Sequence, residues 1–366
     1  MAYDESNIRT LSSIEHIRQR PGMYIGRLGS GAHPDDGIYI LLKEVIDNAI
    51  DEFMEGNGNR IVVTQEGQKC SVRDYGRGIP LNKLIECVSV INTGAKYDNE
   101  AFQYSVGLNG VGTKAVNALS KYFEITSWRE GEYMHAVFER GKLKEKKRGK
   151  GDEPNGTFVS FIPDDDPSIF GSYSYNEDFI RERLWNYAYL NKGLTMVFNG
   201  KIIRSQNGLT DLVRKILGED GLYPLINFKN NHLEFSFTHT NGYGESYRSY
   251  VNGQYTSDGG THEAAFKEGI LKGINEFYHK SWAAPEIRDG IVATIAIKVM
   301  NPVFESQTKN KLGNTDVRSW IVPEVKEAVI DCLMKNKDIA KGLEDKIINN
   351  EKVHKEEAAV RNGAKE

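Results

Sequence analysis

The stretch LLKEVIDNAIDEF, Leu41 to Phe53, has the spacing of an amphipathic helix. Its apolar residues recur at three- and four-residue intervals, which is the period of one helix face. The polar residues on the other side are Glu44, Asp47, Asn48, Asp51 and Glu52. Like charges four residues apart each cost a helix roughly 0.2–0.5 kcal/mol. An acidic, lysine-poor face is therefore kept at some cost to the helix, and a function would explain it.

The composition narrows the class of protein. The chain has 366 residues, enough for two or three domains, and a formal net charge of −4, so overall charge does not indicate nucleic-acid binding, although a local basic patch stays open. The three cysteines are odd in number and form no C-x-x-C pair, which favours reduced thiols. No run of about 18 apolar residues occurs, so we expect a soluble, cytoplasmic protein and no membrane partner.

The hydrophobic pattern changes around residues 207–212, which predicts a domain boundary there. Before it we expect a helix at about 38–55, short strands, and a glycine-rich stretch at 105–113 that runs into a helix at 113–120. After it we expect helices at 209–217, at about 261–279 and from 314 onward, with strands at 233–239, 246–251 and 291–299. The lysine-rich segment Arg140–Lys150 is interpreted as a solvated hairpin or loop, with a DNA-contacting role as the alternative.

Two glycine-bearing motifs follow the acidic helix. In DYGRGIP, Asp74 to Pro80, the aspartate could accept a hydrogen bond from an exocyclic amine such as that of adenine, and the glycines let the backbone approach a flat ring. A plain turn after a strand is the alternative. In GLNGVGTK, Gly107 to Lys114, glycines lead into a helix and could bind phosphate, but the Gly-Thr-Lys order departs from the Walker sequence.

A third motif, QTK at Gln307 to Lys309, lies far downstream. Alone it would be an ordinary solvated lysine. The order E-x-x-x-N, D-x-G-x-G, G-L-x-G-V-G and Q-T-K, together with RPGMYIG (20–26) and DGGTH (258–262), resembles the ATPase region of the B subunit of bacterial type IIA topoisomerases. Within that family, the long GAHPDDG loop before the helix resembles the topoisomerase IV branch more than the gyrase branch.

The resemblance implies a fold and three segments. The fold class is α+β, a Bergerat-type (GHKL) ATPase sandwich followed by a smaller α+β transducer. Residues 1–206 would form the ATP-binding domain with an N-terminal dimerisation arm, residues 207–350 the transducer, and residues 351–366 an exit helix toward a DNA-cleaving domain. No motif of that cleaving domain occurs in the chain, so we expect it to be part of a longer subunit.

The resemblance also implies residue roles. Glu44 would be the general base, Asn48 the Mg²⁺ ligand, and Lys309 would reach the γ-phosphate. The other expected nucleotide-binding residues are Asp74, Arg77, Gly78, Pro80 and Thr157 around adenine; Lys96, Gly107, Leu108, Asn109, Gly110, Val111 and Gly112 in a phosphate lid; Gln307 beside the lysine; and Tyr3 and Ile8 in an arm that covers the nucleotide of the other copy. Glu52 would pair with Arg77, and Asp51 would be solvated. Asp47 is left undecided between helix-cap contacts and support of the neighbouring site residues.

The implied function is Mg²⁺-dependent ATP hydrolysis that drives dimerisation of a gate and passage of a DNA strand. The implied partners are a second copy of the chain, the topoisomerase A subunit, double-stranded DNA and aminocoumarin-type inhibitors. Arg248, Lys267 and Lys272 could line a cavity for DNA or simply be solvated. The alternatives are a gyrase B subunit, a mismatch-repair clamp, a chaperone, a sensor histidine kinase and a binding module without catalysis.

Three positions depart from the family pattern. Ile40 stands where many members have a histidine that orients the base. His135 aligns with an arginine of the gyrase pocket, so the contacts of that arginine to inhibitors are not carried over to this chain. Phe102 replaces a tyrosine near the lid.

Overall fold

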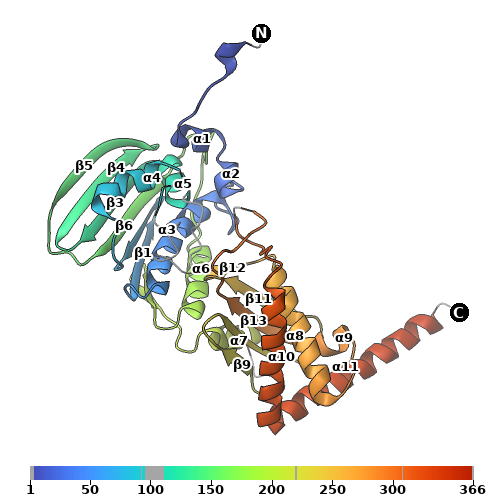
Figure 1. Ribbon diagram of the computed structural model, residues 1–366. Helices are drawn as coiled ribbons and strands as arrows, with labels where there is room; N and C mark the ends of the chain where they lie inside the picture. The colour runs from blue at the N-terminus through green and yellow to red at the C-terminus, as the bar shows by residue number, and fades with distance from the viewer. Residues whose placement is uncertain (1–3, 92, 95–110, 219–220, 307, 365–366) are drawn as a thin grey trace. The chain divides into compact units, whose positions relative to one another are not determined.

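The computed structural model describes residues 4–91, 93–94, 111–218, 221–306 and 308–364 (Figure 1). The expected Tyr3, Lys96, Phe102, Gly107, Leu108, Asn109, Gly110 and Gln307 lie outside these residues. The chain divides into two compact units, Met1–Ser205 and Gln206–Glu366, each with its own hydrophobic core. No helix of the described residues is both long and apolar enough to cross a membrane.

Unit 1 is built on an eight-stranded sheet with the order β5-β4-β3-β6-β2-β1-β7-β8. Neighbouring strands are antiparallel except for β1 and β7, which pair in parallel. The strands are β1 Arg60–Glu66, β2 Lys69–Asp74, β3 Ser120–Arg129, β4 Glu132–Glu139, β5 Lys142–Lys150, β6 Gly156–Pro163, β7 Thr195–Phe198 and β8 Lys201–Ile203.

The helices of unit 1 position the site residues. Short 3-10 turns occupy Glu5–Asn7 and Leu81–Lys83, and the helices are α1 Ser13–Gln19, α2 Gly22–Ile25, α3 Gly37–Met54, α4 Leu84–Ser89, α5 Gly112–Ala118 and α6 Glu177–Leu190. The predicted helix at 38–55 is therefore confirmed as α3. It contacts α5 on one side and strands β2 and β6 on another.

The polar face of α3 is largely buried, whereas we expected part of it to be solvated. Asp51 is 0% exposed and Asp47 is 1% exposed, so the expectation of a solvated Asp51 is wrong. Asp47 forms an ion pair of 2.9 Å with Lys43 and accepts a hydrogen bond from Tyr187 of α6. The helix is buried nearly all round because neighbouring elements cover its polar side as well as its apolar side. Asp47 therefore links the middle of α3 to α6 and does not cap the helix.

The lysine-rich segment forms a hairpin with β4, in agreement with its interpretation as a solvated hairpin or loop. Arg140 and Gly141 make the turn, both with positive φ, and β5 follows as an exposed edge strand.

Unit 2 has a five-stranded sheet with the order β12-β11-β13-β10-β9. The strands are β9 Ile226–Lys229, β10 Leu233–His239, β11 Ser246–Val251, β12 Gln254–Tyr255 and β13 Ile291–Ile297. The helices are α7 Leu209–Leu217, α8 Thr261–Tyr278, α9 Ala284–Arg288, α10 Arg318–Lys335 and α11 Lys337–Gly363. The boundary drawn after residue 350 falls inside α11, because that helix continues unbroken from Lys337.

Candidate nucleotide site

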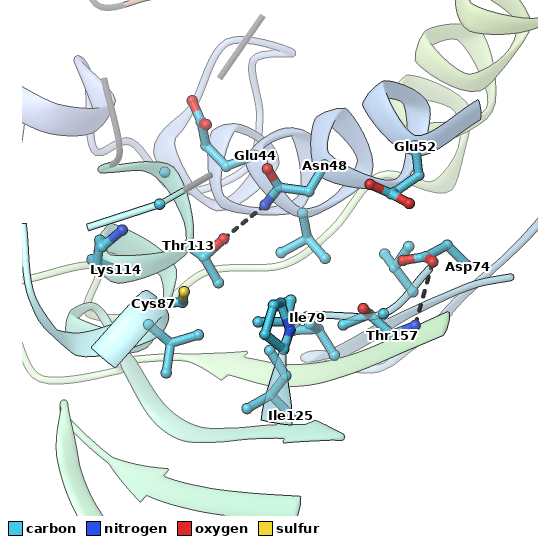
Figure 2. A pocket seen from close by; sticks show the side chains of 18 of the residues that line it. Glu44, Asn48, Glu52, Asp74, Ile79, Cys87, Thr113, Lys114, Ile125 and Thr157 are labelled. Atoms are coloured by element: carbon cyan, nitrogen blue, oxygen red, sulfur yellow. Dashed lines mark hydrogen bonds between the residues drawn. The ribbon is translucent and has the colours of Figure 1, made fainter. Parts of the chain in front are cut away.

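A pocket of about 360 Å³ opens between α3 and the sheet of unit 1 (Figure 2). We call it the α3 pocket. Most of its wall is apolar, with a few polar groups at its ends, a composition typical of small-ligand sites. Its lining residues include Glu44, Val45, Asn48, Glu52, Val72, Asp74, Arg77, Gly78, Ile79, Pro80, Cys87, Val88, Val111, Gly112, Thr113, Lys114, Ile125, Arg129, Thr157 and Val159. Figure 2 shows Glu44 and Lys114 toward one end and Asp74 and Thr157 toward the other.

Glu44 and Asn48 lie one turn apart on α3, so both side chains line the same pocket. Glu44 is only 5% exposed, and within the described residues its carboxylate forms no hydrogen bond or ion pair. A Cβ on Gly112 would lie 2.3 Å from Glu44 Oε2, so a side chain at position 112 would displace this carboxylate. Asn48 Nδ2 donates to Thr113 Oγ1 at 2.7 Å, which ties α3 to α5.

Asp74 ends β2 at the opposite end of the pocket and is 8% exposed. Its Oδ1 accepts hydrogen bonds from the backbone N–H groups of Gly76 at 2.9 Å and Thr157 at 3.3 Å. Within the described residues nothing donates to Oδ2. Burial raises the pKa of Asp74 to about 6, against the opposing effect of the Gly76 hydrogen bond.

Arg77 and Glu52 form the expected pair at the rim. Arg77 Nη2 donates to Glu52 Oε1 at 2.8 Å and Nε donates to Oε2 at 3.1 Å, a bidentate arrangement. Gly78 has a φ of +78°, and a Cβ there would lie 2.6 Å from the Trp128 carbonyl oxygen. This backbone therefore needs glycine to run along the pocket.

Besides Arg77, the pocket is lined by Arg129 at the end of β3, and not by the residue at position 135. Arg129 Nη1 donates to the Gly78 carbonyl oxygen at 3.2 Å, whereas His135 bonds Thr126 and does not line the pocket. The expectation that His135 takes this place is wrong. Arg129 ends β3 and His135 lies in β4 of the same hairpin. The sequence does not show which of the two strands reaches the pocket, because this depends on how β3 pairs with β4 and β6.

Sequence reasoning also missed Cys87, Thr113 and Lys114. Lys114 is 4% exposed and its Nζ donates to the Thr93 carbonyl oxygen at 2.5 Å. Thr113 and Lys114 are the last two residues of the motif GLNGVGTK, so that motif carried a signal for them. Cys87 had no such signal, because it reaches the pocket from the separate helix α4.

The oxygen donors of the pocket fit a metal ion that takes one or two ligands from the protein and the others from bound phosphates and water. Among the described residues there is no group of three or more His, Cys, Asp or Glu side chains that could hold a metal ion. Mg²⁺ prefers hard oxygen ligands and often takes one or two from the protein and the rest from phosphates and water. The Asn48 amide and the Glu44 carboxylate are oxygen donors of that kind.

The remaining expected residues lie elsewhere. Ile8 is 71% exposed, next to the 3-10 turn near the N-terminus. Lys309 belongs to unit 2, in the loop between β13 and α10, where it is 4% exposed with a φ of +60°. A non-glycine residue with that φ costs of order 1 kcal/mol or more, so the surrounding loop must hold it.

The three basic residues considered for a DNA cavity have protein partners. Lys267 pairs with Glu263 at 3.3 Å, Lys272 pairs with Glu268 at 2.8 Å, and Arg248 donates to the Tyr255 hydroxyl at 2.8 Å. The two lysines are therefore each paired with an acid, whereas Arg248 donates to a neutral hydroxyl and keeps its charge.

Comparison with known proteins identifies the family. A model for "Histidine kinase-, DNA gyrase B-, and HSP90-like ATPase" matches residues 34–167, and a model for "DNA gyrase B" matches residues 196–362. The second match extends the similarity beyond the ATPase fold that the kinase and chaperone alternatives share.

The B subunit of DNA topoisomerase 4 from Borreliella burgdorferi is 53% identical over 365 residues, covering 100% of this chain and 61% of that protein. The B subunit of DNA gyrase from Thermus thermophilus is 36% identical over 382 residues, covering 95% of this chain and 59% of that protein. The chain thus spans about three fifths of the length of these curated relatives.

A solved structure shares the fold over nearly the whole chain. The 43K ATPase domain of Thermus thermophilus gyrase B, solved in complex with an aminocoumarin, superposes with a TM-score of 0.76 at 29% identity, covering 96% of this chain and 98% of that one. The expected GHKL ATPase fold is therefore confirmed. With an α3 pocket in the first unit and a gyrase B match across the second, the chain belongs to the B-subunit family of type IIA DNA topoisomerases and corresponds to the ATPase region of such a subunit.

Proposed function

We propose that the chain binds ATP in the α3 pocket and hydrolyses it with Mg²⁺, as the ATPase region of a topoisomerase IV B subunit. The observation that carries the proposal is the placing of Glu44 and Asn48 one turn apart, across the pocket from a buried Asp74. The identity of 53% to the B subunit of a topoisomerase 4, against 36% to that of a gyrase, favours topoisomerase IV over gyrase.

Adenine would occupy the Asp74 end. Asp74 Oδ2 is the acceptor for the exocyclic amine, while Oδ1 is held by the Gly76 and Thr157 N–H groups. Gly78 and Pro80 line the wall on which the ring would lie. The Arg77–Glu52 pair closes the rim above it.

The triphosphate would extend toward Glu44. This carboxylate has no described partner, so it can accept a hydrogen bond and then a proton from the attacking water. Asn48 would provide a metal ligand, and bound Mg²⁺ would supply neutralisation of the phosphate charge. We assign phosphate contacts to Val111 and Gly112 at the described end of the lid, to Lys96 and Gly107–Gly110 beyond it, and γ-phosphate contact to Lys309 with Gln307.

The whole protein's activity follows from this site by family analogy. ATP binding would join two copies, with Tyr3 and Ile8 in an arm that crosses to the other copy, and the dimer would act as a gate for double-stranded DNA. A topoisomerase A subunit would be the partner that cleaves DNA. Because the ATPase domain of the Thermus thermophilus relative was solved in complex with an aminocoumarin, we extend the proposal to binding of that inhibitor class by this chain.

Replacing Glu44 with Gln tests the proposal. The variant keeps the size of the side chain and one acceptor oxygen but loses the base, so ATP turnover should fall roughly 10²–10⁴-fold. Binding of a non-hydrolysable ATP analogue, measured by calorimetry, should stay within a few-fold of wild type. Glu55→Gln, at the end of the same helix and outside the pocket lining, is the matched control and should turn over normally. Native turnover by Glu44→Gln would remove Glu44 from the base role.

A further inference from the structure

Strand β5 concentrates positive charge at one edge of the large sheet (Figure 1). Its nine residues, KLKEKKRGK, hold six cations and one acid, and all but Gly149 are exposed. The cations are Lys142, Lys144, Lys146, Lys147, Arg148 and Lys150. Since the whole chain carries a net charge of −4, this strand is a strong local departure from the average.

Most of this charge is available to a partner. The side-chain ammonium groups of Lys146, Lys147 and Lys150 form no hydrogen bond or ion pair with any of the described residues. Lys144 lies 3.9 Å from Glu139, and Arg148 lies 3.8 Å from Glu132, with all four side chains about half exposed. Arg148 also donates a hydrogen bond to the neutral side chain of Asn82 at 2.5 Å. Exposed pairs of this kind contribute about 0–1 kcal/mol, so a phosphate could replace the carboxylate at little cost.

The strand sets a regular spacing between cations. Lys146, Arg148 and Lys150 stand opposite Ala136, Met134 and Glu132 of β4, so they share one face of the sheet. Alternate residues of a strand are about 7 Å apart. One DNA strand rises about 3.4 Å per phosphate along the helix axis and also winds around it, so successive phosphates are separated by a distance similar to the spacing of these three cations. Lys147 points to the opposite face.

From this arrangement we infer that β5 is a contact surface for the phosphate backbone of double-stranded DNA. The inference rests on the proposed function for the presence of DNA as a partner, and it adds a surface in unit 1 that shares no residue with the basic set considered for a DNA cavity in unit 2. Contacts made only to phosphates predict binding that is independent of base sequence and strongly dependent on salt.

Protection of a sheet edge is the competing explanation, since lysines discourage strands of other molecules from pairing there. The other edge of this sheet, β8, carries a single lysine in three residues, with Ile202 69% exposed. This sheet therefore has one edge without a basic cluster, although the short length of β8 also discourages pairing with another strand. Cations on both faces of β5 exceed what blocking the edge requires.

The test compares two variants of equal charge. In the first, Lys146, Lys147, Arg148 and Lys150 of β5 are all replaced with Gln. In the second, Lys335, Lys341, Lys352 and Lys355 of α10 and α11 are replaced with Gln; each of these is at least 70% exposed and paired with an acid four residues away. Both changes take the net charge from −4 to −4 − 4 = −8. Binding of a fluorescent duplex of about 30 base pairs is followed by anisotropy from about 50 to 200 mM salt.

We expect the β5 variant to bind at least roughly tenfold more weakly at about 50 mM salt and the slope of log K against log salt to fall in magnitude by about 3–4. The α10/α11 variant should change the slope by less than about 1. Lys146→Gln and Lys150→Gln, made singly, should each lower it by about 1, which guards against misfolding of the fourfold variant.

Equal weakening by both variants, or by neither, would overturn the inference. So would unchanged DNA binding accompanied by self-association of the β5 variant in sedimentation, which assigns the lysines to edge protection. Loss of binding to phosphatidylserine vesicles with DNA binding intact would also overturn it, in favour of an anionic membrane. ATP turnover is measured alongside: a wild-type chain that hydrolyses no ATP would reject the proposed function while leaving the comparison of DNA affinities readable.

Discussion

Asp74 shows at a single residue how recognition competes with stability. Its pKa is raised from 3.8 to about 6 by burial, so the folded state holds the proton more tightly than the unfolded state does. The stabilisation that the proton brings is complete below pH 3.8 and is lost as pH rises through about 6. The difference of about two units corresponds to about 3 kcal/mol as an order of magnitude.

Replacing Asp74 with Asn should therefore stabilise the fold at pH 8, by about 1–3 kcal/mol, while it abolishes ATP binding. Asn can keep an oxygen toward the Gly76 and Thr157 N–H groups, but it then presents an NH₂ group to the adenine amine. Denaturant unfolding at pH 5 and pH 8, with ATP titrations, measures both effects. Asp152→Asn, at an exposed position, is the control. A less stable Asp74→Asn chain at pH 8 would contradict the account, and wild-type ATP affinity should itself fall below about pH 6.

Cys87 provides a chemical probe of the α3 pocket. It is a partly exposed thiol on the pocket wall, whereas Cys70 is fully buried and Cys332 lies in unit 2. Burial raises the pKa of Cys87, so its alkylation should quicken as pH rises. A non-hydrolysable ATP analogue should slow maleimide labelling of Cys87 at least roughly tenfold and leave Cys332 unaffected, as read by mass spectrometry of peptides. Equal labelling of Cys87 with and without nucleotide would place the nucleotide elsewhere.

At the scale of elements, local patterns were sufficient for the helices and strands whose period is strong. The stretches 209–217, 233–239 and 246–251 were predicted with the boundaries that the structure has, because apolar residues recur there without interruption. Glu44, Asn48 and Asp74 could also be predicted to share a site, but from the family resemblance rather than from their spacing.

The failures at this scale have one physical cause. The burial of Asp51 depends on elements that pack against the polar side of α3, and the arrival of Arg129 at the pocket depends on strand pairing over long distances. Cys87 likewise reaches the pocket from α4. None of these contacts is between residues that are close in sequence, so no local period or motif reports them.

The DGGTH turn is an element that holds the Lys309 loop. Asp258 N–H donates to the Asn310 carbonyl oxygen at 2.9 Å, and Thr261 N–H donates to that of Leu312 at 3.1 Å. Gly260 has a φ of +137°, and a Cβ there would lie 2.5 Å from the Leu312 carbonyl oxygen. The turn and the loop can therefore be this close only with glycine at position 260.

Replacing Gly260 with Ala should push the loop away and lower both stability and ATP turnover, by about 1–3 kcal/mol in unfolding free energy. Gly244→Ala is the matched control, because its φ of +81° carries a backbone cost but nothing lies within 4 Å of the added Cβ. Thermal unfolding and steady-state turnover compare the two. If both variants lost stability equally, the contact with Leu312 would contribute nothing beyond backbone strain.

At the scale of the whole molecule, the chain consists of two units with separate cores, and the two halves match different family models. The residues proposed to contact ATP come from both units, with Glu44, Asn48 and Asp74 in the first and Lys309 in the second. A nucleotide bound by both would couple their arrangement to the state of the γ-phosphate, which is how hydrolysis could be converted into movement of a gate.

Sedimentation of the chain with Mg²⁺ and a non-hydrolysable ATP analogue tests this central claim most directly. We predict that the analogue converts the wild-type monomer of 41.2 kDa into a dimer of 2 × 41.2 = 82.4 kDa. The nucleotide-free chain and the Asp74→Asn variant should both remain monomeric. A chain that binds the analogue and still sediments at 41.2 kDa would keep its nucleotide site but contradict the ATP-operated gate.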